Sequence, residues 1–121
     1  MKHIKNNEFL FTDEDGQKRI FLREKYFDFV CQLITDFFEK KIIQNEFYDY
    51  FVNLLNDLED YEGVDFINHQ IPLHWALCII QNKHTIDSFT AEEYERFKIF
   101  SLKFKKQNNI TSIILDYNIS T

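Results

Sequence analysis

Two histidines near the middle of the chain, His69 and His74, are the first residues whose types suggest chemistry, because imidazole nitrogens bind transition metals. Asp65 could complete such a site. However, Pro72 lies between the histidines and separates a loop residue from a helical one, so a five-residue spacing puts them on no common helical face. Structural or surface histidines are therefore favoured. A small metal-dependent enzyme using His69 and His74 remains a secondary alternative.

The two cysteines, Cys31 and Cys78, are the candidates for nucleophilic catalysis. Each lies within an apolar run at a core-facing helical position, where burial raises the pKa of a thiol and makes it unreactive. The acidic run from Asp13 to Gly16 resembles the opening of a calcium loop, but it has neither the spacing nor the closing glutamate of that loop. We therefore expect no metal, no cofactor and no catalytic activity.

The acidic residues of the central third carry the most information about function. Residues 42–82 contain seven acidic residues and no lysine or arginine, in a chain with 14 bases and a formal charge of −6. Five acids are concentrated between residues 57 and 65, next to two aromatic residues. We expect these seven residues to form a partner-binding surface: Asp57, Glu59, Asp60, Tyr61, Glu62, Asp65 and Phe66.

Crowded carboxylates repel one another, and at the end of a helix the macrodipole opposes them as well. A surface that attracts a basic protein explains this crowding, with the carboxylates steering association and Tyr61 and Phe66 acting as anchors. A solvated acidic loop is the competing interpretation. The lysines of residues 98–106 share their helix with three glutamates, so they do not indicate direct nucleic-acid binding.

The leading functional hypothesis is a non-catalytic inhibitor that neutralises a basic protein, such as an immunity protein or antitoxin against a bacterial nuclease-type toxin. One alternative is a phage-type inhibitor that mimics nucleic acid and occupies a basic groove with its carboxylates. No motif is specific enough to indicate a family. These are functional classes that a small, acidic chain without motifs permits.

Hydrophobic periodicity predicts a mainly α-helical α+β domain, with an all-α fold as the second choice. The sequence favours a hairpin around Gly16, a helix over about 24–42, and a second helix from Asn45 to about 60, ended by Gly63. A loop is expected over 61–71. Pro72 opens a buried central helix.

The last third is expected to contain a fourth helix and a strand. Thr90 and Glu93 form a capping box, with Phe89 and Tyr94 as a hydrophobic staple, so this helix should run from Ala91 to about Gln107. The β-branched run over 110–117 is expected to pair with the hairpin as a small antiparallel sheet. The sequence thus predicts four helices.

Length and composition limit the possible classes of protein. The 121 residues fit a single domain, 1–121, and 17% aromatic residues exclude intrinsic disorder. Two glycines are too few for phosphate-binding loops. Two cysteines and the absence of an apolar N-terminal or membrane-spanning run favour a cytoplasmic protein. The richness in Asn, Ile, Lys and Phe is typical of an AT-rich bacterial or phage genome.

Overall fold

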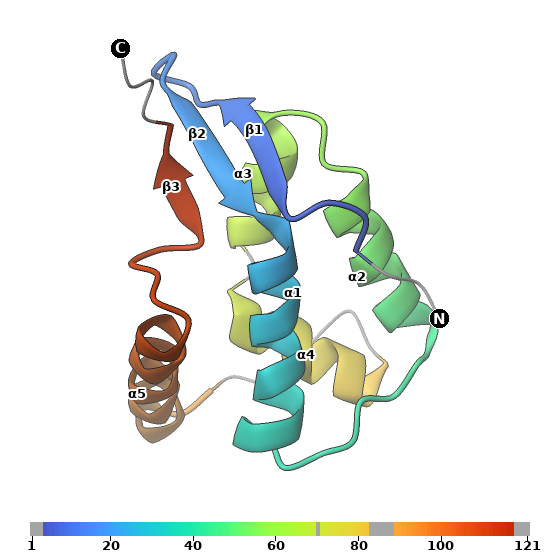
Figure 1. The fold of residues 1–121 in the computed structure, drawn as a ribbon. Helices are drawn as coiled ribbons and strands as arrows, with labels where there is room; N and C mark the ends of the chain where they lie inside the picture. Colours follow the sequence, from blue (N-terminus) through green and yellow to red (C-terminus); the bar gives the residue numbers. More distant parts are fainter. Residues whose placement is uncertain (1–3, 70, 83–88, 118–121) are drawn as a thin grey trace.

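The computed structural model describes residues 4–69, 71–82 and 89–117 (Figure 1). Strands β1 (Glu8–Thr12) and β2 (Lys18–Leu22) form the predicted hairpin, and β3 (Ile114–Asp116) pairs antiparallel with β2. Gly16 has φ +78° in the turn, as expected. The antiparallel sheet has the order β1-β2-β3. The strand predicted over 110–117 is confirmed in position but is only three residues long.

The described residues contain five α-helices, so the predicted count of four was wrong. They are listed here in chain order: α1 (Arg23–Gln32), α2 (Glu46–Asn56), α3 (Tyr61–His69), α4 (Pro72–Gln81) and α5 (Ala91–Gln107). A single π-helical stretch, η1 (Leu33–Phe37), continues α1. The mainly helical α+β class is confirmed, and the all-α alternative is wrong.

Helix α3 is the element that the sequence analysis missed, since residues 61–71 were expected to be a loop. Gly63 does not end the preceding helix. It lies in the first turn of α3, where a Cβ atom would come within 3.0 Å of the Leu58 side chain. Glycine therefore allows the chain to turn closely around Leu58, while Val64 and Ile67 bury the inner side of the helix.

Two predicted helix ends were also wrong. The first helical stretch stops at Phe37 and not at 42: Glu39 adopts a left-handed φ of 55°, and Ile42 and Ile43 are 37% and 49% exposed. The second helix ends at Asn56 and not at 60. In both places the apolar periodicity extends beyond the helix, because the final apolar residues belong to the connection that follows.

The predicted N-terminal residues of three helices are confirmed. The Asn45 side chain accepts a hydrogen bond from the Tyr48 N–H (2.9 Å), and Pro72 occupies the first turn of α4. At the start of α5, Thr90 and Glu93 form a reciprocal capping box, and the Phe89 and Tyr94 rings lie 5.5 Å apart. Helix α5 has the predicted bounds, from Ala91 to Gln107.

A single core cluster includes residues of β1, β2, η1 and all five helices. The predicted central helix α4 buries five residues: Leu73, Trp75, Ala76, Cys78 and Ile79. Cys78 is fully buried and Cys31 is partly buried. Burial raises the pKa of Cys31 to about 12 and that of Cys78 to about 11, so both remain thiols at neutral pH. None of the described helices combines the length and apolar character needed to cross a membrane.

Candidate functional site: an acidic pocket between the hairpin turn and α3

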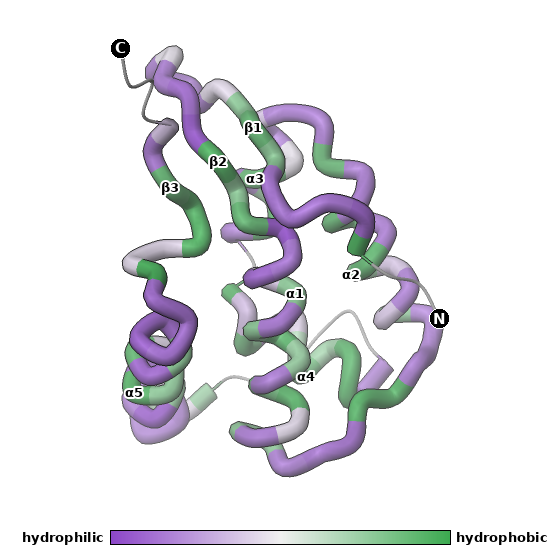
Figure 2. The backbone as a smooth tube through the Cα atoms, viewed as in Figure 1, coloured by the Kyte–Doolittle hydropathy of each residue, from purple (hydrophilic) through white to green (hydrophobic). Residues whose placement is uncertain are grey.

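The inner face of the sheet changes from apolar to charged towards the hairpin turn. In the strand register Phe9 lies opposite Phe21, and Phe11 lies opposite Arg19, so these four side chains share one face. Ile114 and Asp116 of β3 pair with Phe21 and Arg19 on that face. Figure 2 shows the same change, with β2 hydrophilic near the turn and hydrophobic where it leads into α1. Charged groups therefore gather at the turn end of the sheet.

The hairpin turn is held together by Asp13. Its carboxylate accepts hydrogen bonds from the backbone N–H groups of Asp15 and Gln17, both at 2.9 Å, and forms an ion pair with Arg19 Nε at 2.8 Å. The Gln17 N–H, and then the Arg19 side chain and the Asp15 N–H, lower the pKa of Asp13 against the opposing effect of burial. Asp13 is therefore a structural carboxylate. Arg19 also reaches Asp116 at 3.6 Å.

Helix α3 brings its N-terminal turn to this end of the sheet. Two buried donors, Tyr26 Oη (3.3 Å) and Trp75 Nε1 (3.2 Å), both donate to the Ile67 carbonyl oxygen near the other end of α3. These bonds satisfy a carbonyl that lacks an intrahelical partner, and they fix the helix against α1 and α4. Tyr61 then packs its ring on Phe11, with centroids 6.4 Å apart.

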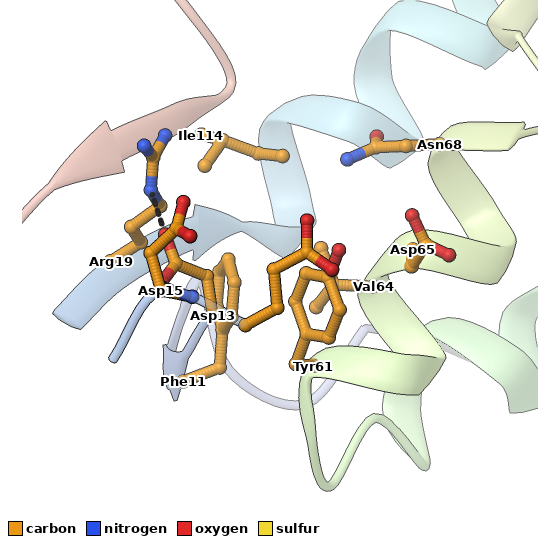
Figure 3. Close-up of a pocket in the computed structure, with 10 residues that line it drawn as sticks. Phe11, Asp13, Asp15, Arg19, Tyr61, Val64, Asp65, Asn68 and Ile114 are labelled. Atoms are coloured by element: carbon orange, nitrogen blue, oxygen red, sulfur yellow. Dashed lines mark hydrogen bonds and ion pairs between the residues drawn. The ribbon is translucent and has the colours of Figure 1, made fainter. Parts of the chain in front are cut away.

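Between the turn and α3 lies a pocket of about 280 Å³, shown in Figure 3. Asp13, Glu14 and Asp15 line it from the turn, and Tyr61, Asp65 and Asn68 line it from α3, at the i, i+4, i+7 positions of one helical face. Within the described part of the chain, Arg19 is the one cation among the lining residues. The pocket is therefore strongly acidic.

The pKa of Tyr61 reflects the acidic surroundings of this pocket. Burial raises its pKa, and the carboxylates of Asp65, Glu14, Asp13 and Asp15 raise it further, in that order of effect. The phenol therefore keeps its proton at neutral pH, and its oxygen can accept a hydrogen bond from a cationic group. The carboxylates of Glu14, Asp15 and Asp65 accept no hydrogen bond from any other described residue, whereas Asp13 is already engaged. Three carboxylates and a phenol are thus available to a cationic group.

The structure separates the seven residues that the sequence analysis grouped together. Tyr61 and Asp65 line the acidic pocket. Glu59 and Asp60 lie beside it in a neighbouring groove, which Tyr61 and Phe11 also line. Glu62 is exposed on α3. Phe66 is 47% exposed and its ring lies 6.3 Å from Trp75, away from the pocket. Tyr61 and Phe66 therefore do not line the same pocket.

Asp57 and Asp60 have structural surroundings that the sequence did not show. Asp57 caps the end of α2, where the helix dipole opposes it, but its charge acts on the buried Arg23. Burial lowers the pKa of Arg23 and Asp57 raises it, while the guanidinium lies 5.5 Å above the Phe9 ring. Asp60 accepts from the Gly63 N–H at 3.0 Å, as an N-cap of α3 does. The crowding of acids is therefore partly explained by the charge of Arg23 beside Asp57 and by the capping of α3 by Asp60.

We expect Asp60→Ala to lower the free energy of unfolding by about 0.5–2 kcal/mol, because the α3 backbone loses an acceptor. Asp60→Asn keeps the acceptor and should cost less. Chemical denaturation of both variants measures the difference. An alanine variant as stable as the wild type would show that Asp60 does not cap α3.

The acids of the hairpin turn are the site residues that sequence reasoning missed. Asp13, Glu14 and Asp15 were interpreted as a solvated turn, and no spacing in the chain relates them to Asp65. For the metal hypothesis, His69 is an exposed residue at the end of α3, and burial lowers the pKa of His74 on α4. Among residues 4–69, 71–82 and 89–117, no three His, Cys, Asp or Glu side chains gather so as to hold a metal ion.

Comparisons of this chain with protein-family models, with curated proteins and with solved structures found no match. The functional argument therefore rests on the pocket and its chemistry.

Proposed function

We propose that this protein is a non-catalytic inhibitor that binds a basic protein partner, most consistently a nuclease-type toxin, and that the acidic pocket receives a cationic side chain of that partner. The observation that carries the proposal is the convergence of Glu14 and Asp15 from the turn with Asp65 from α3 around a protonated Tyr61. Two separate segments of the chain thus line one acidic pocket.

The pocket has the chemistry to hold lysine or arginine. Hydrogen bonds between a cation and carboxylates are roughly twice as strong as neutral ones. The negative field outside the pocket also steers a basic partner towards it. Nucleases hold the phosphate backbone with lysine and arginine, so the cationic groups of a nuclease-type toxin are the groups that this pocket would cover.

A nucleic-acid mimic, as a phage-type inhibitor would be, is the second candidate. The acids extend from the hairpin turn across the 57–60 connection to α3, and they are not confined to one helix end. A mimic uses such a spread of carboxylates in place of phosphates. The range of targets distinguishes the two candidates: an inhibitor of a nuclease-type toxin should block cleavage by that nuclease alone, whereas a mimic should also displace duplex DNA from basic proteins that are not nucleases.

The test is a matched capture from the cell that produces this protein. The wild type and the double variant Glu14→Lys/Asp65→Lys are used as baits under the same conditions. The proposal expects a basic protein that the wild type retains and the variant loses. The variant Asp36→Lys/Glu39→Lys, with an equal change in net charge at exposed positions away from the pocket, should retain it. Equal retention by all three baits would refute the pocket as the binding site.

A further inference from the structure

Helix α5 presents two opposite faces with different surroundings. Its inner face carries Phe97, Phe100 and Phe104, whose rings lie 6.0, 6.0 and 4.6 Å from the ring of Phe29 on α1. Its outer face carries Ile99 and Leu102, which are 67% and 68% exposed, the highest values among the large hydrophobic side chains in the described part of the chain. Figure 1 shows α5 at the edge of the molecule. The outer face is therefore open to a partner.

The outer apolar pair lies between charges of opposite sign. Glu95, Ile99, Leu102 and Lys106 follow the 4-3-4 spacing of one stripe along the helix, and we call these four residues the α5 stripe. Both ends of the stripe are exposed, as its middle is. The order along the helix is acid, apolar, apolar, base. This order is complementary to itself when it is reversed.

We propose that the α5 stripe binds the α5 stripe of a second copy of this chain, with the two helices antiparallel. In this arrangement Glu95 faces the partner subunit's Lys106, and Ile99 faces the partner subunit's Leu102, with each contact made twice about a two-fold axis. A parallel arrangement would instead place like charges together, with Glu95 facing Glu95 of the partner subunit and Lys106 facing Lys106 of the partner subunit. The opposed helix dipoles also favour the antiparallel pair.

The internal ion pair of Glu95 does not prevent this contact. Glu95 Oε1 lies 3.3 Å from Lys98 Nζ, but the two side chains are 69% and 68% exposed, and such pairs contribute little. Four cations flank the stripe: Arg96, Lys98, Lys103 and Lys105. These four cations repel the four equivalent cations of the second copy. With only two apolar residues from each chain at the centre, the dimer belongs to the small and weak class of interfaces.

The first measurement is sedimentation equilibrium over a wide range of protein concentration. Wild-type protein should associate to a dimer, and Ile99→Ser/Leu102→Ser should raise the dissociation constant at least about tenfold, because the apolar centre is lost. Ile43→Ser removes another exposed isoleucine, 49% exposed and outside α5, and should leave association unchanged. A wild-type chain that stays monomeric up to about 1 mM overturns the proposal.

A charge exchange tests the antiparallel arrangement. Glu95→Lys puts two lysines against each other and should weaken the dimer, whereas Glu95→Lys/Lys106→Glu restores opposite charges and should recover wild-type association. Circular dichroism checks that both variants keep their helix content. A dimer that the double exchange does not recover overturns the antiparallel pairing, and so does a dimer that Ile99→Ser/Leu102→Ser leaves intact. The outcome is independent of the acidic pocket, since none of these residues lines it.

Discussion

Replacing Phe29 with alanine should lower the free energy of unfolding by about 3–5 kcal/mol. Phe29 is 3% exposed, and its ring contacts the three phenylalanine rings of the inner face of α5. The substitution leaves a cavity at the point where α1 holds α5, and it removes aromatic contacts that burial alone does not account for. Since a domain of this size is stable by only about 5–15 kcal/mol, the loss should be readily visible in chemical denaturation.

Leu102→Ala is the matched control for this prediction. It also shortens a large hydrophobic side chain of α5, but Leu102 lies in the α5 stripe, is 68% exposed and has little burial to lose. At concentrations where the protein is monomeric, its stability should stay within about 0.5 kcal/mol of the wild type. Equal effects of Phe29→Ala and Leu102→Ala would mean that α5 does not dock through Phe29.

Reversing two charges in the acidic pocket should slow association with the basic partner at least about tenfold at low ionic strength, because steering by charge contributes about 10–10³-fold to such rates. The variant is Glu14→Lys/Asp65→Lys, and the measurement is stopped-flow or surface-based kinetics with the captured protein. Asp60 is left unchanged because it caps α3. The wild-type rate should also fall as salt rises, since the Debye length shortens to about 10 Å at 0.1 M.

Removing the hydroxyl group of Tyr61 should change the dissociation rate and not the association rate. Tyr61→Phe keeps the ring on Phe11 but removes the phenol oxygen, which can accept a hydrogen bond from the cationic side chain of the partner. Dissociation should therefore accelerate, while the salt dependence of association stays. The control Asp36→Lys/Glu39→Lys should leave both rates close to those of the wild type. If the pocket reversal and this control slow association equally, net charge and not the pocket accounts for the effect.

Local signals in the sequence were sufficient wherever a few neighbouring residues determine the structure. The start of α2 at Asn45, the start of α4 at Pro72, the capping box of α5 and the hairpin around Gly16 were all predicted correctly. In each case, groups within about four residues of one another satisfy the backbone, or glycine permits the conformation. The mainly helical α+β class followed from the same signals and from hydrophobic periodicity.

Helix ends and helix α3 could not be predicted in this way. Gly63 has the residue type of a helix terminator, yet here it gives room to Leu58. Ile42 continues the apolar period of α1 but lies in the exposed connection after η1. Whether an apolar residue extends a helix or packs from a loop depends on which surface is available to cover it, and that surface comes from distant parts of the chain.

For the candidate site too, the sequence determined some features and the tertiary structure decided the others. The sequence by itself determined that the negative charge of this protein gathers in its middle third, and it grouped Tyr61 and Asp65 with five other residues of that segment. Only the tertiary structure decided that Asp65 faces Glu14 and Asp15 of the hairpin turn, that Phe66 points elsewhere, and that Asp57 and Asp60 have structural partners. The reason is physical: charges 50 residues apart in the chain have no fixed distance until Phe11 and Tyr61 pack together and the Ile67 carbonyl is held by Tyr26 and Trp75.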